Sequence, residues 1–303
     1  MVSVVCVGIA ALDQVFGVGT MPSRAEKYRS DTLHVTGGGT AANAAVAAAR
    51  LGAAVTFYGV LGDDRIGDEI VAGLAAGGVD CGGIRRVAGR RSPLSAILVD
   101  RAGDRLIVSY ADPKLPWSTE HLPDRLPGGV DAVLGDTRWQ AGSAHFFRLA
   151  RAAGVPAVLD ADRGPKEVPE LMDLATHVAF SHQGARDLTG EEDPSAALRT
   201  IGVRSSTWLA VTHGAEGVFY WRGGKVVHQR AFPVQAVDTL GAGDTWHGAF
   251  AVAVAEDASE DEAVRFASAA AALKCTRFGG RDGAPLRQEV DRFLAGAQGQ
   301  DEG

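Results

Sequence analysis

The hydrophobic residues of the chain fall into short apolar runs that alternate with longer stretches of helical periodicity. Such runs, bounded by turn residues, are typical of strands that are buried on both faces. The runs lie at 2–8, 55–60, 132–135, 157–159, 177–180 and 208–212, and the helical stretches at 40–51, 66–76, 141–153, 167–174, 183–188 and 261–276. Because strands alternating with helices require right-handed crossovers, this order predicts a parallel sheet covered by helices on both faces.

Two regions break this alternation. Strand-like runs at 15–16 and 33–35 lie on either side of a polar turn at 21–27, and runs at 94–99 and 106–110 are separated by the turn 100–104. No helical pattern separates the strands within either region. We expect the segments at about 14–35 and 93–111 to form a small antiparallel sheet that acts as a lid. Such a sheet has one face to hide, either over a ligand or against a second subunit.

The bulk composition narrows the class of protein. The chain has 303 residues, 46% of them hydrophobic, and a net charge of −7. We expect one α/β domain spanning residues 1–303. A nucleic-acid surface would need clustered basic residues, and the chain has no basic block. Cys6, Cys81 and Cys275 lack the spacing of a disulfide framework or a zinc site. Without an apolar run of membrane length or a leader pattern, we expect a cytoplasmic protein with no membrane partner.

The strongest candidate for chemistry is the turn at 238–243, which runs directly into an alanine-rich helical pattern near Asp244. Gly241 and Gly243 can adopt positive φ, so consecutive amides can point to one side. The helix that follows adds its free N–H groups and its positive dipole end, which suits a phosphate. Asp244 would repel a static phosphate, but it could accept the proton of a hydroxyl that attacks one. The alternative is that Asp244 only caps the helix.

A second glycine-rich turn, at 37–43, lies between a strand and a helical pattern. The spacing Gly37-x-Gly39-x-x-Ala42 imitates a dinucleotide-binding fingerprint, which would indicate a nicotinamide-dependent dehydrogenase. In such proteins, however, the first helix follows the first strand, whereas this turn comes after the lid. Asp13 follows the first strand closely, where α/β folds place ligand groups, or it lies in a solvated turn.

The sequence Asp238-Thr-x-Gly-Ala-Gly-Asp244 resembles the C-terminal signature of the PfkB carbohydrate kinases, and the turn at 37–43 resembles their N-terminal signature. The resemblance implies a ribokinase-like three-layer αβα sandwich with a mainly parallel central sheet, and ATP and Mg²⁺ as cofactors. It makes Gly241, Ala242 and Gly243 the anion hole and Asp244 the catalytic base. The sugar contacts that it implies are Asp13, Gly38, Gly39 and Asn43.

The same resemblance implies a nucleotide site. The turn Thr212-x-Gly214-x-x-Gly217 matches a family turn that borders ATP, and the region around Lys274 and Gly280 is expected to close over adenine and, in many members, a monovalent cation such as K⁺. In one respect the chain departs from the family. The usual Asn-x-x-Glu, whose Glu helps to order the magnesium shell, is replaced by Ser181 and Gly184. The metal contacts of the protein are therefore unknown, although Mg²⁺ is still expected to bridge the ATP phosphates.

Two cations indicate an anionic sugar. Lys27 lies in the lid turn, and Arg138 follows a central strand in Gly135-Asp-Thr-Arg-Trp139. A guanidinium has the planar fork that suits phosphate or sulfonate oxygens. Over nearly its whole length the chain resembles the sulfofructose kinases, a bacterial branch of the family, which phosphorylate the 1-hydroxyl of 6-deoxy-6-sulfofructose. This similarity implies a sulfonate pocket of Lys27, Arg138 and Ser109, where Ser109 replaces an Asn.

Several alternatives stay open. The Ser109 substitution leaves room for a 6-phosphosugar, as in a fructose-6-phosphate or tagatose-6-phosphate kinase, and a neutral-sugar kinase such as a ribokinase or fructokinase is the next alternative. A nicotinamide dehydrogenase and a non-catalytic sugar-binding protein belong to different classes. We also expect a homodimer that pairs through the lid, because the lid has an apolar face to hide.

Overall fold

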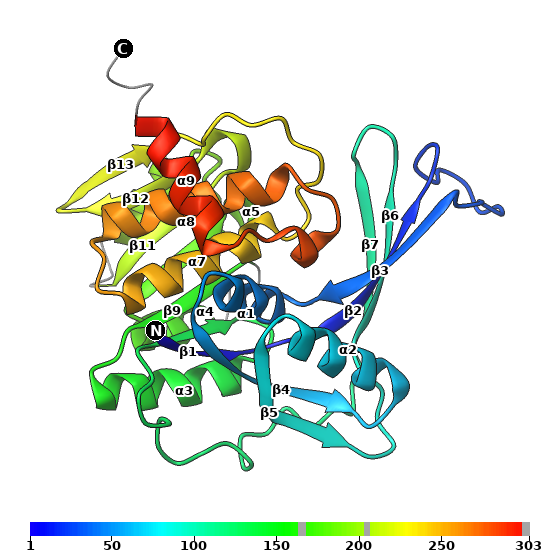
Figure 1. The fold of residues 1–303 in the computed structure, drawn as a ribbon, viewed down its shortest axis with the longest axis horizontal. Coiled ribbons are helices and arrows are strands. Elements are labelled where there is room, and N and C mark those ends of the chain that lie inside the picture. Colours follow the sequence, from blue (N-terminus) through cyan, green and yellow to red (C-terminus); the bar gives the residue numbers. More distant parts are fainter. Residues whose placement is uncertain (163–167, 203–206, 299–303) are drawn as a thin grey trace.

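The central sheet follows the predicted alternation. The computed structural model describes residues 1–162, 168–202 and 207–298. Its main sheet has the order β13-β12-β11-β10-β9-β8-β1-β4-β5 (Figure 1), in which all neighbours are parallel except the β11–β12 and β12–β13 pairs. The strands are β1 (Ser3–Val7), β4 (Ala54–Gly62), β5 (Val79–Val87), β8 (Ala132–Asp136), β9 (Ala157–Ala161), β10 (His177–Ser181), β11 (Trp208–Thr212), β12 (Val218–Arg222) and β13 (Lys225–Gln229).

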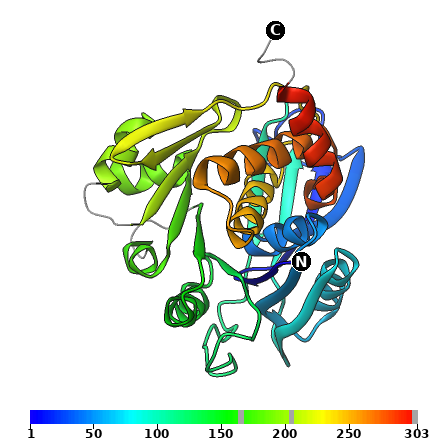
Figure 2. The ribbon, with the colours of Figure 1, turned by 60° about the vertical axis from the view of Figure 1, so that its left-hand side comes forward.

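Helices cover both faces of this sheet, as Figures 1 and 2 show. Alternate residues of β1 feed two separate cores: Val4 and Cys6 pack with one helix layer, and Val5 and Val7 with the other. The first layer holds α1 (Thr40–Arg50), α2 (Arg65–Ala76), α7 (Ala242–Ala255), α8 (Glu260–Cys275) and α9 (Arg287–Gln298), and the second holds α3 (Gln140–Ala153), α4 (Val168–Leu174), α5 (His182–Thr189) and α6 (Pro194–Gly202). The expected three-layer αβα architecture is confirmed.

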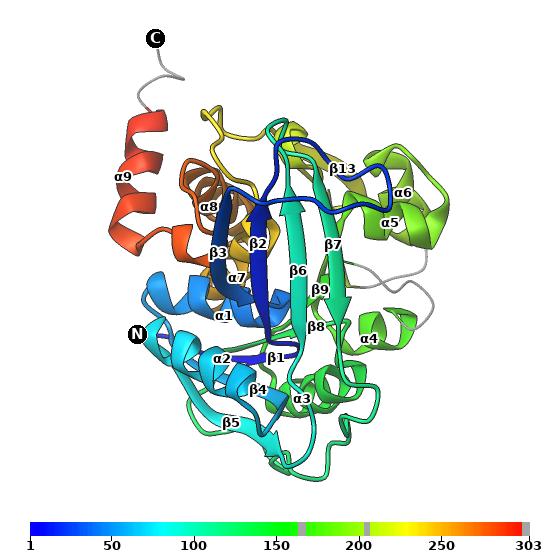
Figure 3. The same ribbon diagram turned by 90° about the vertical axis from the view of Figure 1, so that its right-hand side faces the viewer.

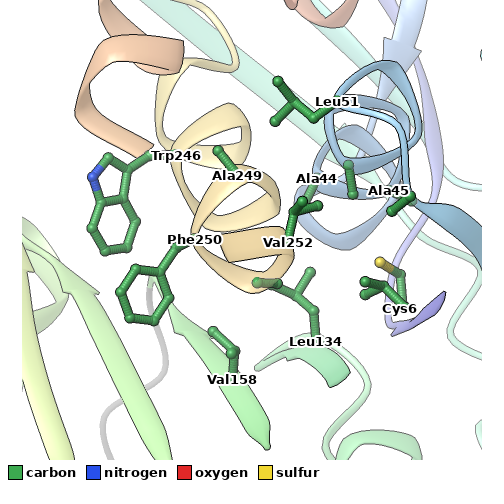
Figure 4. Packing of buried hydrophobic residues seen from close by; sticks show 14 of the residues in the cluster. Cys6, Ala44, Ala45, Leu51, Leu134, Val158, Trp246, Ala249, Phe250 and Val252 are labelled. Atoms are coloured by element: carbon green, nitrogen blue, oxygen red, sulfur yellow. The ribbon is translucent and has the colours of Figure 1, made fainter. Parts of the chain in front are cut away.

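Helix α7 is the central element of the first layer. From Thr245 to Ala255 every residue is buried, because α1 and α8 pack against it on either side. Trp246 and Phe250 stack with ring centroids 5.0 Å apart, and Val252 lies toward Ala44 of α1 (Figure 4). Small residues let the helices approach closely, and this packing fixes the position of the α7 N-terminus.

The lid is a separate four-stranded sheet of order β3-β2-β6-β7, seen face-on in Figure 3. Its strands are β2 (Ala11–Gly17), β3 (Thr32–Gly38), β6 (Leu94–Val99) and β7 (Arg105–Tyr110). The β2–β3 and β6–β7 pairs are antiparallel as expected, while β2 and β6 run parallel. The inner face carries buried Asp13, Val15 and Ile97, whereas the outer face exposes large apolar side chains, namely Leu33, Val35, Leu106, Val108 and Tyr110.

A few elements lie outside the predicted pattern. Strand β5 was missed because Gly82-Gly83 and Arg85-Arg86 interrupt its apolar run, which is tolerable at the sheet edge that it occupies. Helices α6 and α9 were also missed. The first residue of the helix expected at 167–174 lies outside the described residues.

Candidate active site

The carboxyl ends of β1 and β8 and the start of α1 are joined by one buried carboxylate, that of Asp136. Its side chain is 1% exposed. Oδ2 accepts hydrogen bonds from the Ile9 amide at 2.8 Å and the Thr40 hydroxyl at 3.0 Å, and Oδ1 accepts from the Arg138 and Trp139 amides at 2.9 and 3.1 Å. Asp136 thus fixes three loops at the point where an α/β sheet binds ligands. Sequence reasoning gave it no role.

The carboxylate of Asp238 fixes the conformation of the turn at 238–243. Oδ1 accepts from the Leu240 amide at 2.8 Å, and Oδ2 accepts from the amides of Gly279 and Gly280 at 3.2 and 3.1 Å. Gly241 then caps α7 with φ of 77°, a conformation that other residues rarely adopt. Its positive φ turns the chain directly into the helix.

The amides of this turn are largely available. Ala242 donates to Thr239 O in a long turn bond of 3.3 Å, while the amides of Gly241 and Gly243 have no acceptor within the described part of the chain. They lie at the positive end of a 14-residue helix. Free amides at a helix N-terminus are suited to a phosphate or to the developing charge of a phosphoryl transfer.

Two cations converge on Asp238 from opposite sides. The Lys274 side chain is fully buried, and its ammonium donates to Asp238 O at 2.8 Å and lies 3.3 Å from Oδ2. Arg105, at the start of lid strand β7, donates to the Thr239 hydroxyl at 2.6 Å and lies 3.5 Å from Asp238 Oδ1. Burial is the main influence on Lys274 and lowers its pKa. The core and the lid therefore both hold the same turn.

Asp244 lies in the first turn of α7, next to these amides. Its Oδ2 accepts a 2.7 Å hydrogen bond from the Asn43 side chain. Burial, reinforced by the nearby carboxylate of Asp160, raises the pKa of Asp244 to about 8, while the Asn43 hydrogen bond acts in the opposite direction. A carboxyl group with a pKa near the working pH is suited to accept a proton during a reaction.

A second acid lies behind Asp244, at the end of β9. Asp160 is 2% exposed, its Oδ1 has no hydrogen-bond partner in the described residues, and its Oδ2 lies 3.5 Å from Nδ1 of His247. Burial raises the pKa of Asp160 well above the usual value and lowers that of His247. Neither residue stood out in the sequence, because each sits in an ordinary apolar stretch.

The inner face of the lid contributes a polar row above this site. Thr36, Asp13, Ser95 and Ser109 are cross-strand neighbours on four adjacent strands. The Ser95 and Ser109 hydroxyls are 3.3 Å apart. Burial raises the pKa of Asp13, and the hydrogen bond from Ser95 opposes this shift. Any side chain at Gly38 would overlap the Asp13 carboxylate, so the glycine allows Asp13 to lie against the turn that precedes α1.

A cavity of about 840 Å³ separates the outer half of the lid from the anion-binding turn. Val15, His34 and Arg105 line it from the lid. The opposite wall comes from the segments 236–240 and 278–280. Its size is that of a small-molecule site. The cavity therefore ends against residues 238–240, directly before the free amides at the N-terminus of α7.

Comparison with known proteins identifies the family. The family model for "pfkB family carbohydrate kinase" matches residues 1–287. A ribokinase of Haemophilus influenzae is 32% identical over 93% of this chain and 95% of its own length. The chain belongs to the PfkB family of carbohydrate kinases. It is therefore a sugar kinase, which transfers a phosphoryl group from ATP to a sugar hydroxyl.

Solved PfkB-type structures have the same fold. A protein of Agrobacterium tumefaciens, proposed to be a ribokinase, is 39% identical with a TM-score of 0.91, and the match covers 98% of both chains. A ribokinase of Arabidopsis thaliana, solved with ribose and ATP, is 27% identical with a TM-score of 0.83 over 97% of this chain and 99% of that one. In the described residues of the present chain, no helix has the length and apolarity needed to span a bilayer.

The PfkB resemblance implied several sugar contacts, and the structure gathers most of them. Asn43 and Asp244 are in direct contact, while Gly38 and Asp13 adjoin each other. Gly39 caps α1 beside them.

The three residues of the expected sulfonate pocket are not brought together. Ser109 lies in the row of Asp13, whereas Lys27 is exposed in the β2–β3 connection, which begins after Gly17, about 13 Å along β2 from Asp13. Arg138 is partly exposed and pairs with Asp162 at 3.2 Å. Within one chain, therefore, Lys27 lies apart from Ser109.

The expected nucleotide residues divide into two groups. Thr212 ends β11 and donates to Phe180 O at 3.2 Å, and Gly214 and Gly217 border the following turn, η1 (Gly214–Glu216). Gly280 and Lys274 instead serve the Asp238 turn. Because the Lys274 side chain is wholly buried and its ammonium is engaged with Asp238, it presents no surface to a nucleotide. The expected contact of Lys274 with the nucleotide is replaced by its contact with Asp238.

The missing Glu of the metal motif has a steric explanation. Gly184 packs so tightly on the end of β9 that a Cβ atom would meet the carbonyl oxygens of Ala161 and Asp162. No side chain fits there. No cluster of three or more acidic, His or Cys side chains with metal-binding geometry occurs within residues 1–162, 168–202 and 207–298.

Proposed function

We propose that the enzyme uses Asp244 to accept the proton of the attacking sugar hydroxyl while the amides of Gly241 and Gly243 receive the transferring phosphoryl group. The observation that carries this assignment is the 2.7 Å contact between Asn43 and Asp244 beside free helix amides. Asn43 donates through Nδ2, and this hydrogen bond orients the Asp244 carboxylate. The buried Oδ1 of Asn43 has no hydrogen-bond partner in the described residues. A sugar hydroxyl could donate to that oxygen. Phosphoryl transfer relies mainly on such positioning and charge stabilisation.

The residues present fit a magnesium ion that is held chiefly by the nucleotide. Asp162 follows β9 with a partly exposed carboxylate, and it lies close enough to Asp244 to raise the pKa of that group. We assign Asp162 to the metal shell in place of the Glu that Gly184 excludes. When bound, Mg²⁺ would offset the negative charge of the ATP phosphates. Thr212, Gly214 and Gly217 would border the nucleotide.

The proposed substrate is 6-deoxy-6-sulfofructose, phosphorylated on its 1-hydroxyl. Asp13 and Gly38 would contact the hydroxyls, while Arg138 and Ser109 would read the sulfonate. The support is that Ser109 extends the Asp13 row and that Arg138 is anchored by Asp136 through its amide. Lys27 could reach the tail only through movement of the lid connection or from a second subunit. A fructose 6-phosphate or tagatose 6-phosphate kinase would use the same cations.

Ribose is the second candidate, favoured by the ribokinase identity of the relative from Haemophilus influenzae. A coupled ADP-release assay over sulfofructose, fructose 6-phosphate, fructose and ribose separates these possibilities. Arg138→Ala should reduce kcat/KM for sulfofructose far more than for fructose. Arg148→Ala is the matched control, because Arg148 forms a similar exposed ion pair with Glu170 at 3.1 Å away from the cleft. Highest activity on ribose, with no effect of Arg138→Ala, would reject sulfofructose.

We infer that the chain needs no free monovalent cation at the Asp238 turn. The resemblance implied such an ion near Lys274, but the Lys274 ammonium already lies against both the carbonyl and the carboxylate of Asp238. A tethered ammonium supplies the positive charge that would otherwise come from K⁺.

We also propose a homodimer through the outer face of the lid. Leu33 and Val35 on β3 and Val108 on β7 are 60%, 45% and 61% exposed, although these strands are the two edges of the lid. The cross-strand row Leu33, Phe16, Leu98 and Leu106 joins the two edges into one apolar face. Contiguous apolar surface of this kind is usually covered by a partner. ATP as the phosphoryl donor accords with the cytoplasmic location expected from the sequence.

A further inference from the structure

Arg281, in the short helix η2 (Gly280–Gly283), is a buried cation that the carboxylates of Asp282 and Asp13 face only from beyond ion-pair distance. It is 4% exposed, and within the described part of the chain its guanidinium has no hydrogen bond and no carboxylate at ion-pair distance. Its neighbour Arg277, by contrast, forms two hydrogen bonds to Glu289 at 3.1 and 2.7 Å. Nη1 of Arg281 is fully buried and unpartnered. A buried charge is normally paired, so this guanidinium calls for a partner from outside the chain.

The surroundings of Arg281 are shaped for a guanidinium. Gly37 of β3 and Gly73 of α2 flank it, and a side chain at either position would collide with the guanidinium. Two elements far apart in the sequence thus lack side chains where Arg281 lies. The packing of β3 and α2 therefore leaves a fixed space for the guanidinium of Arg281.

A cavity of about 330 Å³ adjoins Arg281, between α1, α2 and β3. Arg50, at the C-terminal end of α1, lines the same cavity, and its Nε is also buried without a hydrogen-bond partner. The carboxylates of Glu69 and Asp282 reach the rim, but both residues are exposed to water, and in residues 1–162, 168–202 and 207–298 neither pairs with these arginines. The two guanidinium groups in the cavity therefore require a hydrogen-bond acceptor.

We propose that this cavity, the Arg50–Arg281 pocket, binds a small oxyanion of the phosphate class. Two guanidinium groups offer several donors to one tetrahedral group, and arginine forks suit phosphate oxygens in particular. The volume admits inorganic phosphate or the phosphate end of a small phosphate monoester.

The pocket is separate from the proposed phosphoryl-transfer site. Successive residues of a strand point to opposite faces, and Gly37 faces Arg281 whereas Gly38 faces the Asp13 carboxylate. An anion in the pocket therefore sits across β3 from the sugar site. Its binding would stiffen the end of β3 that leads into Gly39, so the bound anion acts as an effector of sugar affinity rather than as a substrate.

Thermal unfolding of the full chain in chloride buffer, at fixed ionic strength and with a saturating non-hydrolysable ATP analogue and Mg²⁺, tests this proposal. Inorganic phosphate should raise the unfolding midpoint even though the nucleotide site is filled, and glycerol phosphate tests whether a monoester also fits. Arg50→Gln should raise the phosphate dissociation constant by roughly ten- to hundredfold, the effect of losing one charge-assisted hydrogen bond. Arg292→Gln, an exposed substitution on α9, should leave it unchanged.

The Arg281→Met variant provides a second, independent test. In chloride buffer it should be at least as stable as the wild type, because it removes a buried charge that forms no ion pair in the described residues, and phosphate should no longer stabilise it. Phosphate stabilisation that nucleotide abolishes, or that persists in Arg50→Gln, would overturn the proposal. If Arg281→Met does not fold, the Arg50→Gln result decides. Because the readout is binding and not turnover, failure here leaves the kinase mechanism untouched, and failure of that mechanism leaves this pocket.

Discussion

Replacing Asn43 by Ala tests how the base is tuned. The only hydrogen bond to the Asp244 carboxylate among the described residues comes from Asn43, and it lowers a pKa that burial raises to about 8. A hydrogen bond to a charged group contributes about 1.5–3 kcal/mol, and one pKa unit corresponds to about 1.36 kcal/mol. The substitution should therefore raise the Asp244 pKa by roughly one to two units.

The sign of the rate effect follows from the role of the group. A base must be ionised, so kcat/KM should rise about tenfold per pH unit below the pKa and level off above it. In the wild type this plateau begins near pH 8. In Asn43→Ala the whole profile should move to higher pH by about one to two units, so that at pH 7 the ionised fraction falls by roughly ten- to hundredfold.

The assay is steady-state ADP release from pH 5.5 to 10 at saturating Mg·ATP, with kcat/KM for the sugar fitted at each pH. Gln288→Ala, which removes a side-chain amide from α9, is the control and should keep the wild-type profile. A uniform loss of activity with an unshifted profile would mean that Asn43 only contacts the sugar. A wild-type profile that is flat above pH 5 would refute the raised pKa itself.

Three further changes test the supports of the site. Arg105→Ala removes the lid contact to Asp238 and Thr239, so the sugar KM should rise and kcat fall several-fold in steady-state kinetics. Arg24→Ala, in the exposed β2–β3 connection away from the cavity, should change neither constant. Equal effects of the two substitutions would show that the Arg105 contact does not hold the turn. Lys274→Met should lower kcat sharply, and added K⁺ or ammonium should restore part of it. Wild-type turnover should be the same in K⁺ and Na⁺ salts. A wild-type enzyme that depends on K⁺ would contradict the inference that the Lys274 ammonium replaces a monovalent cation. Val108→Glu on the outer lid face should halve the mass measured by light scattering, and an unchanged mass would move the dimer interface elsewhere.

The fold was largely predictable because its signal is local. Each apolar run from β1 to β11 carries its own strand pattern, and the helices between them carry theirs, so the parallel sheet and both helix layers followed from the order of segments. Strand β5 escaped prediction because an edge strand tolerates glycine pairs and arginines that a central strand would not. The lid also followed from its short strands, although the parallel β2–β6 pair joins segments that no turn connects.

The candidate site was predictable only where its residues are contiguous. The segment 238–244 holds the turn, the helix start and the acid within one stretch, so its pattern indicated phosphate chemistry. Asp136 acts on Thr40 across 96 residues, and Arg105 reaches Asp238 across 133. No periodicity or motif encodes such contacts. Lys27 shows the converse problem, because a cation in a lid turn looks available in sequence but lies beyond the end of the strands.

The central claim is that Asp244 takes a proton from the sugar beside the amides of the α7 N-terminus. The most direct measurement is turnover by Asp244→Asn, which keeps the shape and the contact with Asn43 but cannot act as a base, together with its ATP affinity by calorimetry. We expect kcat to fall by at least about a hundredfold, the usual contribution of a general base, with ATP affinity nearly unchanged. A kcat within a few-fold of the wild type would contradict the account.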